Sequence, residues 1–505
     1  MEATATRSRR GLVALVATVA VVAVAFLVAV APWATDDFGY SLDGFNGAAW
    51  GLGARALADD PLDSRLGGVR PEGDRYANHP PLTVWSAAIG SAVSGDEPAA
   101  VRAPALLAGL LALAVLALLL HDAGLRPAAT AAGVALAGTS GMFLTYGAML
   151  DTPVVSLPFG LLALAAAQRV WQRRPPPTPA LVAIGAVAAL AGWQSALAAG
   201  LGGATCLLAA PGEGPSPRRG AVALGAGIAA GAAVTLGWAA WVHGGLRPLI
   251  DQAGFRSGVR RSDAAAGWLD RLGRHLDDLY GPAPVLAAIA VAVALGLVAG
   301  PGRADGTRWW RPAGLRPVLA VLVVTVVGYT LLFRNGAAVH DYWTYWGVAL
   351  VGAGAAAVVQ VLTADDRSPL ARLPDGIRTG VVGVVVVALA VAGYGRQSGA
   401  ETRIREGLDV IPVLEQVDRP DRPTQVVVAV RGSSGELPWV HHIVHGRAVT
   451  ADDVASLRRL PPDLPVLVIL RGPPSPALRA LATDVDEDGR FLLVPAGDLL
   501  RHLGG

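Results

Sequence analysis

The chain has 505 residues, of which 53% are hydrophobic and only 16% are charged. A soluble domain cannot keep that much apolar surface away from water, so the composition excludes a soluble globular protein and indicates a polytopic membrane protein. The 41 basic residues, all arginine, nearly balance 39 acidic residues, and no nucleic acid is expected as a partner. The single cysteine, Cys206, excludes an intrachain disulfide and a cysteine-based zinc site.

The first predicted element is an uncleaved membrane helix over residues 11–33. Its apolar run is longer than the central region of a cleaved signal peptide and is long enough to span a bilayer. The arginines of the stretch RSRR, residues 7–10, precede it. Because basic residues favour the cytoplasmic side, they predict a cytoplasmic N-terminus, and Asp36 and Asp37 then follow the helix on the outer side.

Further apolar runs of spanning length follow, several of them broken by the Gly and Pro that membrane helices tolerate. These runs cover residues 103–120, 128–147, 152–168, 178–193, 195–210, 220–242, 282–300, 316–333, 343–363 and 379–395. Residues 81–98 are apolar for only about thirteen residues, which is too short to cross, so they predict an interfacial helix. We therefore predict an all-α bundle of about eleven transmembrane helices over residues 1–398.

The arginines predict the topology of this bundle. If every run crosses, each of the five cytoplasmic loops carries arginine, as the positive-inside bias requires. The same count places residues 34–102, 148–151, 243–281, 334–342 and everything after about 396 on the outer side of the plasma membrane. One outer loop breaks the rule with Arg256, Arg260 and Arg261, among others. A basic cluster kept on the outer face is suited to hold an anion.

Residues 399–505 differ in character and predict a small extracytoplasmic α/β domain. Short β-branched runs at 425–430, 465–470 and 491–496 alternate there with helical stretches. The motif HHIVH at 441–445 has the four-residue histidine spacing of a zinc-binding helix, but it lacks the HExxH pattern. We therefore do not predict a zinc site in this domain.

Four polar features fall at the outer ends of predicted helices. They are Asp36 with Asp37, His79 in YANHPPL, Asp151 in YGAMLDTP, and His340 with Asp341 in HDYW. A single acid at a helix end is usually a cap or a hydrated loop residue. Because all four features meet at one side of a membrane interior that is otherwise almost free of charge, they favour an active site over four separate caps.

The same residues resemble a known family. The acidic pair after the first helix, the HPPL that opens the interfacial helix, and the stretches GDEPAAVRAPALLAGLL and YGAMLDTPVVSLPFGLLALA resemble GT-C glycosyltransferases of the lipid A aminoarabinose transferase and protein O-mannosyltransferase type. The resemblance covers residues 30–170 and, less closely, HDYW; it does not extend to the C-terminal domain. It implies a multi-helix membrane bundle and a sugar donor carried on polyprenyl phosphate at the outer face.

The resemblance also implies roles for individual residues. By position, Asp36 would be the catalytic base, Asp37 its partner and Asp151 the acid of the second outer loop. The residues expected to hold the donor phosphate are His79, Arg256, Arg260, Arg261 and His340. The alternative role of the three arginines is to contact lipid headgroups. No cofactor is required, although a divalent cation between Asp36 and Asp151 would suit carboxylate ligands.

Elementary chemistry agrees with these roles. No nucleotide sugars are present outside the membrane, so an outward-facing transferase needs a lipid-borne donor. A carboxylate can deprotonate the acceptor hydroxyl as it attacks the anomeric carbon, and attack opposite the phosphate inverts that centre. Arginine can neutralise the departing polyprenyl phosphate. The sequence leaves the sugar open between a pentose such as arabinose and a hexose such as mannose, and the acceptor open between glycan, lipid and protein.

Two other classes of function stay as alternatives. A transporter or flippase of a lipid-linked or small anionic substrate would keep ionisable groups near the midplane, often within paired repeats. Here the acids fall at helix ends, and the sequence contains no visible repeat. The third reading is a membrane anchor whose outer α/β domain binds a partner protein or a cell-wall glycan.

Overall fold

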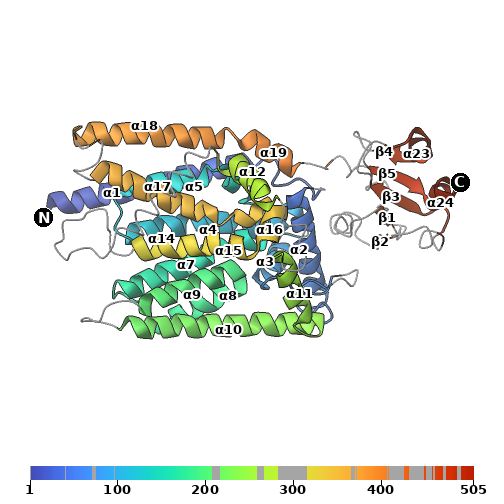
Figure 1. The fold of residues 1–505 in the computed structure, drawn as a ribbon, viewed down its shortest axis with the longest axis horizontal. Coiled ribbons are helices and arrows are strands. Elements are labelled where there is room, and N and C mark those ends of the chain that lie inside the picture. Colours follow the sequence, from blue (N-terminus) through green and yellow to red (C-terminus); the bar gives the residue numbers. More distant parts are fainter. Residues whose placement is uncertain are drawn as a thin grey trace. The chain divides into compact units, whose positions relative to one another are not determined.

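The computed structural model describes most of the chain as helix, with a small sheet near the C-terminus (Figure 1). The described residues are 2–39, 41–70, 75–95, 97–207, 216–258, 267–281, 315–364, 370, 372–405, 408, 426–430, 448–450, 458, 461–469, 474–485 and 491–504. The predicted span 282–300, the residues Arg260 and Arg261, and the histidine motif 441–445 lie outside them.

The chain forms two compact units. The helical unit comprises Met1–Ala31, Ala77–Thr83 and Ala103–Ala400, and the second unit comprises Pro32–Tyr76, Val84–Arg102 and Glu401–Gly505. The division into domains between residues 398 and 399 stays a prediction.

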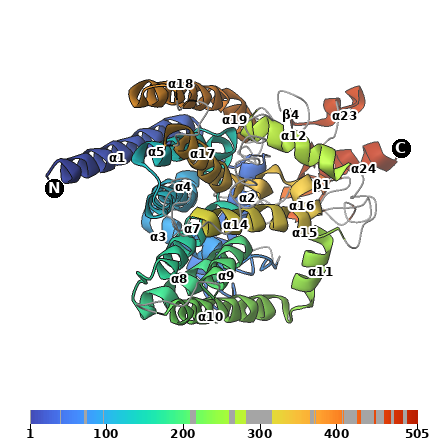
Figure 2. The ribbon, with the colours of Figure 1, turned by 60° about the vertical axis from the view of Figure 1, so that its left-hand side comes forward.

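The helical unit contains most of the long helices, and Figure 2 shows them from a second direction. In chain order the helices of the bundle are α1 (Glu2–Val30), α4 (Pro98–Asp122), α5 (Pro127–Gly138), α6 (Gly141–Tyr146), α7 (Thr152–Trp171), α8 (Thr178–Ala191), α9 (Trp193–Leu207), α10 (Pro217–His243), α11 (Arg247–Arg256), α12 (Trp268–Tyr280), α14 (Leu315–Val323), a π-helical turn (Val324–Gly328), α15 (Tyr329–Leu332), α16 (Arg334–Val339), a 3-10 turn (Asp341–Thr344), α17 (Gly347–Ala364), α18 (Asp375–Tyr394) and α19 (Gln397–Ile404).

Seven helices among the described residues are long and apolar enough to cross a membrane. They are Leu12–Val30, Pro98–Asp122, Thr152–Trp171, Pro217–His243, Leu315–Leu332, Asp341–Thr363 and Asp375–Ile404. The predicted runs 128–147, 178–193 and 195–210 coincide with shorter helices, namely α5 with α6, α8 and α9. The prediction of a mostly helical, polytopic membrane protein is confirmed, whereas the total of about eleven spans stays a prediction.

Helices α8 and α9 are separated by Gly192 alone. Ser195 Oγ donates to the carbonyl oxygen of Gly192 at 2.8 Å and also to the carbonyl oxygen of Ala188, which gives hydrogen-bond partners to backbone carbonyls at the C-terminal end of α8. A Cβ at Gly192 would lie 2.6 Å from Cβ of Ser156 on α7, so only glycine allows this close approach. The hairpin therefore sets Trp193, the first residue of α9, against the start of α7.

The second unit contains α2 (Leu42–Asp59) and most of the short apolar helix α3 (Leu82–Ser94), which coincides with the predicted interfacial helix. Its C-terminal part is a five-stranded sheet of order β2-β1-β3-β5-β4. The elements are β1 (Val426–Val430), β2 (Ala448–Thr450), β3 (Pro465–Ile469), α23 (Pro476–Leu481), β4 (Asp484–Val485), β5 (Phe491–Pro495) and α24 (Ala496–Gly504).

The sheet is mixed, because β1 runs parallel to β2 and β3, whereas β5 runs antiparallel to β3 and β4. Val466, Val468, Leu492 and Val494 alternate along β3 and β5 and pack with Leu499 of α24 in one apolar cluster. The three predicted strands are confirmed as β1, β3 and β5. Strands β2 and β4 are only three and two residues long, and so carry no periodic signal.

Candidate functional site

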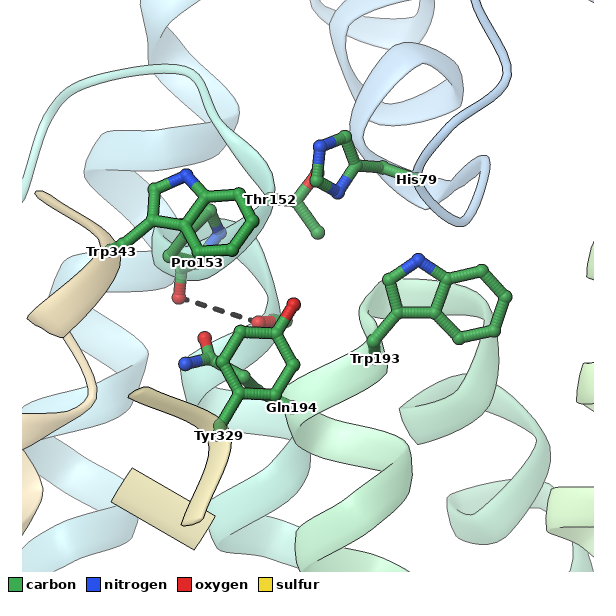
Figure 3. Close-up of a pocket in the computed structure, with 8 residues that line it drawn as sticks. His79, Thr152, Pro153, Trp193, Gln194, Tyr329 and Trp343 are labelled. Carbon is green, nitrogen blue, oxygen red and sulfur yellow. Dashed lines mark hydrogen bonds between the residues drawn. The ribbon is translucent and has the colours of Figure 1, made fainter. Parts of the chain in front are cut away.

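The helical unit contains a cavity of about 250 Å³ at the end where α9 begins. Its walls are mostly apolar, and the lining residues are Asn78, His79, Trp193, Leu249, Ile250, Gln252, Ala253, Arg256, Tyr329, Phe333 and Trp343. A small recess shares four of these residues, His79, Trp193, Tyr329 and Trp343, and adds Thr152, Pro153, Ser156 and Gln194 (Figure 3). The cavity thus combines aromatic walls with one guanidinium and one imidazole.

Arg256, the last residue of α11, supplies the permanent positive charge in this wall. Its guanidinium carbon lies 5.1 Å from the ring centroid of Trp343, a distance at which a cation is attracted to the π face. Asn335 Nδ2 donates to the carbonyl oxygen of Phe255 at 3.0 Å and holds the end of α11 against α16. These two contacts fix a flat, bidentate donor next to an apolar wall, which suits a phosphate group.

His79 lies in the loop that precedes α3, and its loop is anchored to α9. The indole Nε1 of Trp193 donates to the carbonyl oxygen of Asn78 at 3.1 Å. Burial, assisted by the positive charge of Arg256, lowers the pKa of His79 from 6.5 to about 3. The imidazole is therefore neutral at neutral pH and can donate one hydrogen bond to an anion without adding charge.

Asp151 lies at the start of α7 and is only 5% exposed. It is the N-cap residue, and its carboxylate accepts from the backbone nitrogen of Thr152 at 2.7 Å. Thr152 and Pro153 line the recess, so the cap fixes the segment that forms part of its wall.

The residues that line the cavity do not include His340 or Asp341. The ring of His340 stacks on Trp343 with a centroid separation of 6.3 Å, and burial together with Arg256 lowers its pKa to about 3. Asp341 accepts hydrogen bonds from the hydroxyl of Tyr146 to both carboxylate oxygens at 2.8 Å. Asp341 therefore ties the 3-10 turn to α6, and His340 supports a lining residue.

Asp36 and Asp37 belong to the second unit, where Arg102 holds the backbone of their loop. The Arg102 side chain is 1% exposed, pairs with Asp43 at 2.8 Å and bonds the carbonyl oxygens of Ala34 and Asp36. The guanidinium also lies 4.4 Å from the ring centroid of Phe38. A buried arginine thus gives the acidic loop a defined shape.

The two acids differ in their surroundings. Asp36 Oδ2 accepts from Arg405 Nε at 2.7 Å. Partial burial raises the pKa of Asp37; Arg102 opposes this, and the charges of Glu97 and Asp36 add to it. Asp36 is therefore held by a cation, and Asp37 is the acid whose pKa lies above its ordinary value.

Sequence reasoning missed most of the lining residues and both arginines that hold the acidic loop. Trp193 falls between two predicted apolar runs, and Tyr329 and Trp343 resemble ordinary aromatic residues of membrane helices. The sequence pattern therefore does not identify any of the three as a cavity residue. Arg102 could have been found, because an arginine inside an apolar helix demands a partner. Arg405 carried no signal, since its partner Asp36 lies far away in the sequence.

The comparisons with known proteins agree with this picture. Residues 78–238 match the family model described as dolichyl-phosphate-mannose-protein mannosyltransferase. The fold is similar to that of ArnT from Cupriavidus metallidurans in the apo state, with a TM-score of 0.56 and 16% identity over 98% of this chain and 99% of that chain. ArnT from the same organism bound to undecaprenyl phosphate matches with a TM-score of 0.57 and 15% identity, over 95% of this chain and 97% of that chain. No curated protein sequence matches the chain significantly.

These matches extend the resemblance from single motifs to the whole architecture. The family model covers the segment with His79, Asp151 and Trp193, and the shared fold covers nearly the full length. The resemblance drawn from the sequence is confirmed: residues 78–238 match this mannosyltransferase family model, and the fold of the chain is similar to that of ArnT.

Proposed function

We propose that the protein transfers a sugar from a polyprenyl-phosphate donor to an acceptor at the outer face of the plasma membrane. The observation that carries this proposal is the cavity lined by apolar and aromatic side chains, to which Arg256 contributes a guanidinium and His79 an imidazole. A polyprenyl phosphate has the matching character, with an isoprenoid chain that favours apolar walls and a phosphate that favours a guanidinium. A similar fold has been solved as ArnT bound to undecaprenyl phosphate.

In the proposed reaction Asp36 takes the proton of the acceptor hydroxyl as its oxygen attacks the anomeric carbon. The bond from that carbon to the phosphate oxygen breaks, and the polyprenyl phosphate leaves with its electrons. Arg256 and a hydrogen bond from neutral His79 stabilise the departing phosphate. Attack from the side opposite the phosphate inverts the anomeric centre.

The other predicted residues take supporting parts in this proposal. Asp37 is the partner of Asp36 in the acidic pair. Asp151 caps α7 and so shapes the wall of the recess, and His340 stacks on Trp343 and holds that side chain in place. Arg260 and Arg261 are further candidates for contact with the phosphate or with lipid headgroups.

The divalent cation that would suit Asp36 and Asp151 as ligands stays a prediction. No group of three His, Cys, Asp or Glu residues in the described part of the chain is arranged to hold a metal ion. Asp36 already binds Arg405, and Asp151 caps α7. No step of the proposed reaction is therefore assigned to a cation.

The proposal also covers the chemical class of the sugar and of the acceptor. We expect a pentose or hexose donor and a lipid, glycan or protein acceptor. The C-terminal domain carries apolar strands and is proposed to bind the acceptor on the outer side. Transport of a lipid-linked anion is the alternative function, since a cavity of this character would also hold a substrate that is moved unchanged.

A reconstitution experiment separates the two functions. Purified protein in liposomes is given radiolabelled polyprenyl-phosphate sugars together with membrane extract as the acceptor source. We expect label to leave the lipid and appear on an acceptor, and we expect Arg256→Gln to lower this transfer by about 10- to 100-fold at low donor concentration. Movement of intact labelled donor across the bilayer without a glycosyl product would favour the transporter instead.

A further inference from the structure

Arg405 uses all three nitrogens of its guanidinium, two of them on the acidic loop and one on Glu401 of α19. Its Nε donates to Asp36 Oδ2 at 2.7 Å, and its Nη1 donates to Glu401 Oε1 at 2.8 Å. Its Nη2 donates to the carbonyl oxygen of Pro32. One residue just beyond the end of α19 thus touches both the backbone and the carboxylate of the loop that carries Asp36.

The contact leaves one carboxylate oxygen of Asp36 open. Among the residues that the structure describes, Oδ2 is bonded to Arg405, whereas Oδ1 has no hydrogen-bond partner. A general base needs this arrangement, because one oxygen must be held in place while the other accepts the proton.

Arg102 and Arg405 hold different parts of the loop that carries Asp36. Arg102 is buried and bonds the carbonyl oxygens of Ala34 and Asp36, so it fixes the path of the backbone. Arg405 is 42% exposed and bonds the side chain of Asp36. An ion pair with that exposure adds little to the free energy of unfolding, so a stabilising role does not explain this contact well. The contact does, however, fix the orientation of the Asp36 carboxylate.

We propose that Arg405 is a positioning residue for the transfer reaction: it orients the carboxylate of Asp36 toward the acceptor hydroxyl. This inference rests on the proposed function, in which Asp36 is the base. It links the chemistry to the segment that leads into the C-terminal domain, which the sequence alone does not connect with Asp36.

The test compares Arg405→Gln, Arg405→Lys and Arg405→Ala with the parent in the transfer assay. We expect Arg405→Gln to lower kcat by about 100-fold, the size of effect that a misplaced catalytic group produces, with the donor KM and the unfolding temperature unchanged. Arg405→Lys should have a kcat between those of Arg405→Gln and the parent, because the ammonium keeps the positive charge but lacks the planar arrangement of donor nitrogens of a guanidinium. Added methylguanidinium should recover part of the activity of Arg405→Ala.

Arg501→Gln is the matched control, since it removes an exposed ion pair with Asp498 within α24. We expect it to keep the parental kcat. The inference is overturned if Arg405→Gln keeps the parental kcat, if its loss is shared by Arg501→Gln, or if methylguanidinium restores nothing. Failure of the proposed function looks different, because Asp36→Asn would then be fully active.

Discussion

Replacing Arg102 by methionine tests how the acidic loop is built. The side chains of Arg102 and Asp43 are each 1% exposed, and Asp43 Oδ2 receives bonds from Arg102 Nε at 3.2 Å and Nη2 at 2.8 Å. Without the guanidinium, the carboxylate of Asp43 stays buried with its charge uncompensated. Breaking such a buried pair costs about 3–5 kcal/mol of unfolding free energy.

Thermal unfolding in detergent, together with limited proteolysis of the loop that carries Asp36, measures this loss. In Arg102→Met combined with Asp43→Asn, most of the stability should return because the buried charge is gone, but transfer activity should stay low because the loop backbone has lost its donor. Arg169→Met, which breaks the exposed pair with Asp122, should cost about 1 kcal/mol or less. Parental stability in Arg102→Met, or no recovery in the double variant, would refute this reasoning.

Three further variants test the helical unit. Arg256→Gln should raise the donor KM by about 10- to 100-fold, the size of one charge-assisted hydrogen bond, while Arg256→Lys should raise it less; an unchanged KM would remove Arg256 from the donor site. The pKa of His79 is about 3 in the folded state and 6.5 when exposed, so its contribution to stability is present above pH 6.5 and declines as the pH falls toward 3. Unfolding temperatures at pH 7.5 and 5 should therefore differ less in His79→Asn than in the parent, and an equal difference would contradict the assignment. Gly192→Val should destabilise α8 and α9 by about 1–3 kcal/mol because its Cβ would meet Ser156, and a parental unfolding temperature would argue against that packing.

The membrane architecture could be predicted largely from the sequence, because its signals are local. Apolar runs indicate the helices, and arginines in the adjoining loops indicate how each helix is oriented in the membrane. His79 and Arg256 were predicted to share the outer side, and they line one cavity. The predictions for short helices were less complete, since the break between α8 and α9 depends on a single glycine and a contact with Ser156 on α7.

The contacts of the site could not be predicted from the sequence to the same extent. Whether His340 faces a cavity or supports Trp343 depends on the packing of a 3-10 turn, which leaves no period in the sequence. The bond from Arg405 to Asp36 joins segments 369 positions apart, and no local pattern encodes such a pair. Motif resemblance identifies an acid as a candidate base, but only the fold identifies what holds it.

The central claim is that this protein moves a sugar from polyprenyl phosphate with Asp36 as the base. The most direct measurement incubates membranes containing the parent or Asp36→Asn with several radiolabelled polyprenyl-phosphate sugars and follows the label into an acceptor. We predict that the parent transfers label from one of these donors, and that Asp36→Asn inserts normally but transfers none. Transfer at the parental rate by Asp36→Asn, or no transfer by the parent from any donor, would contradict the account.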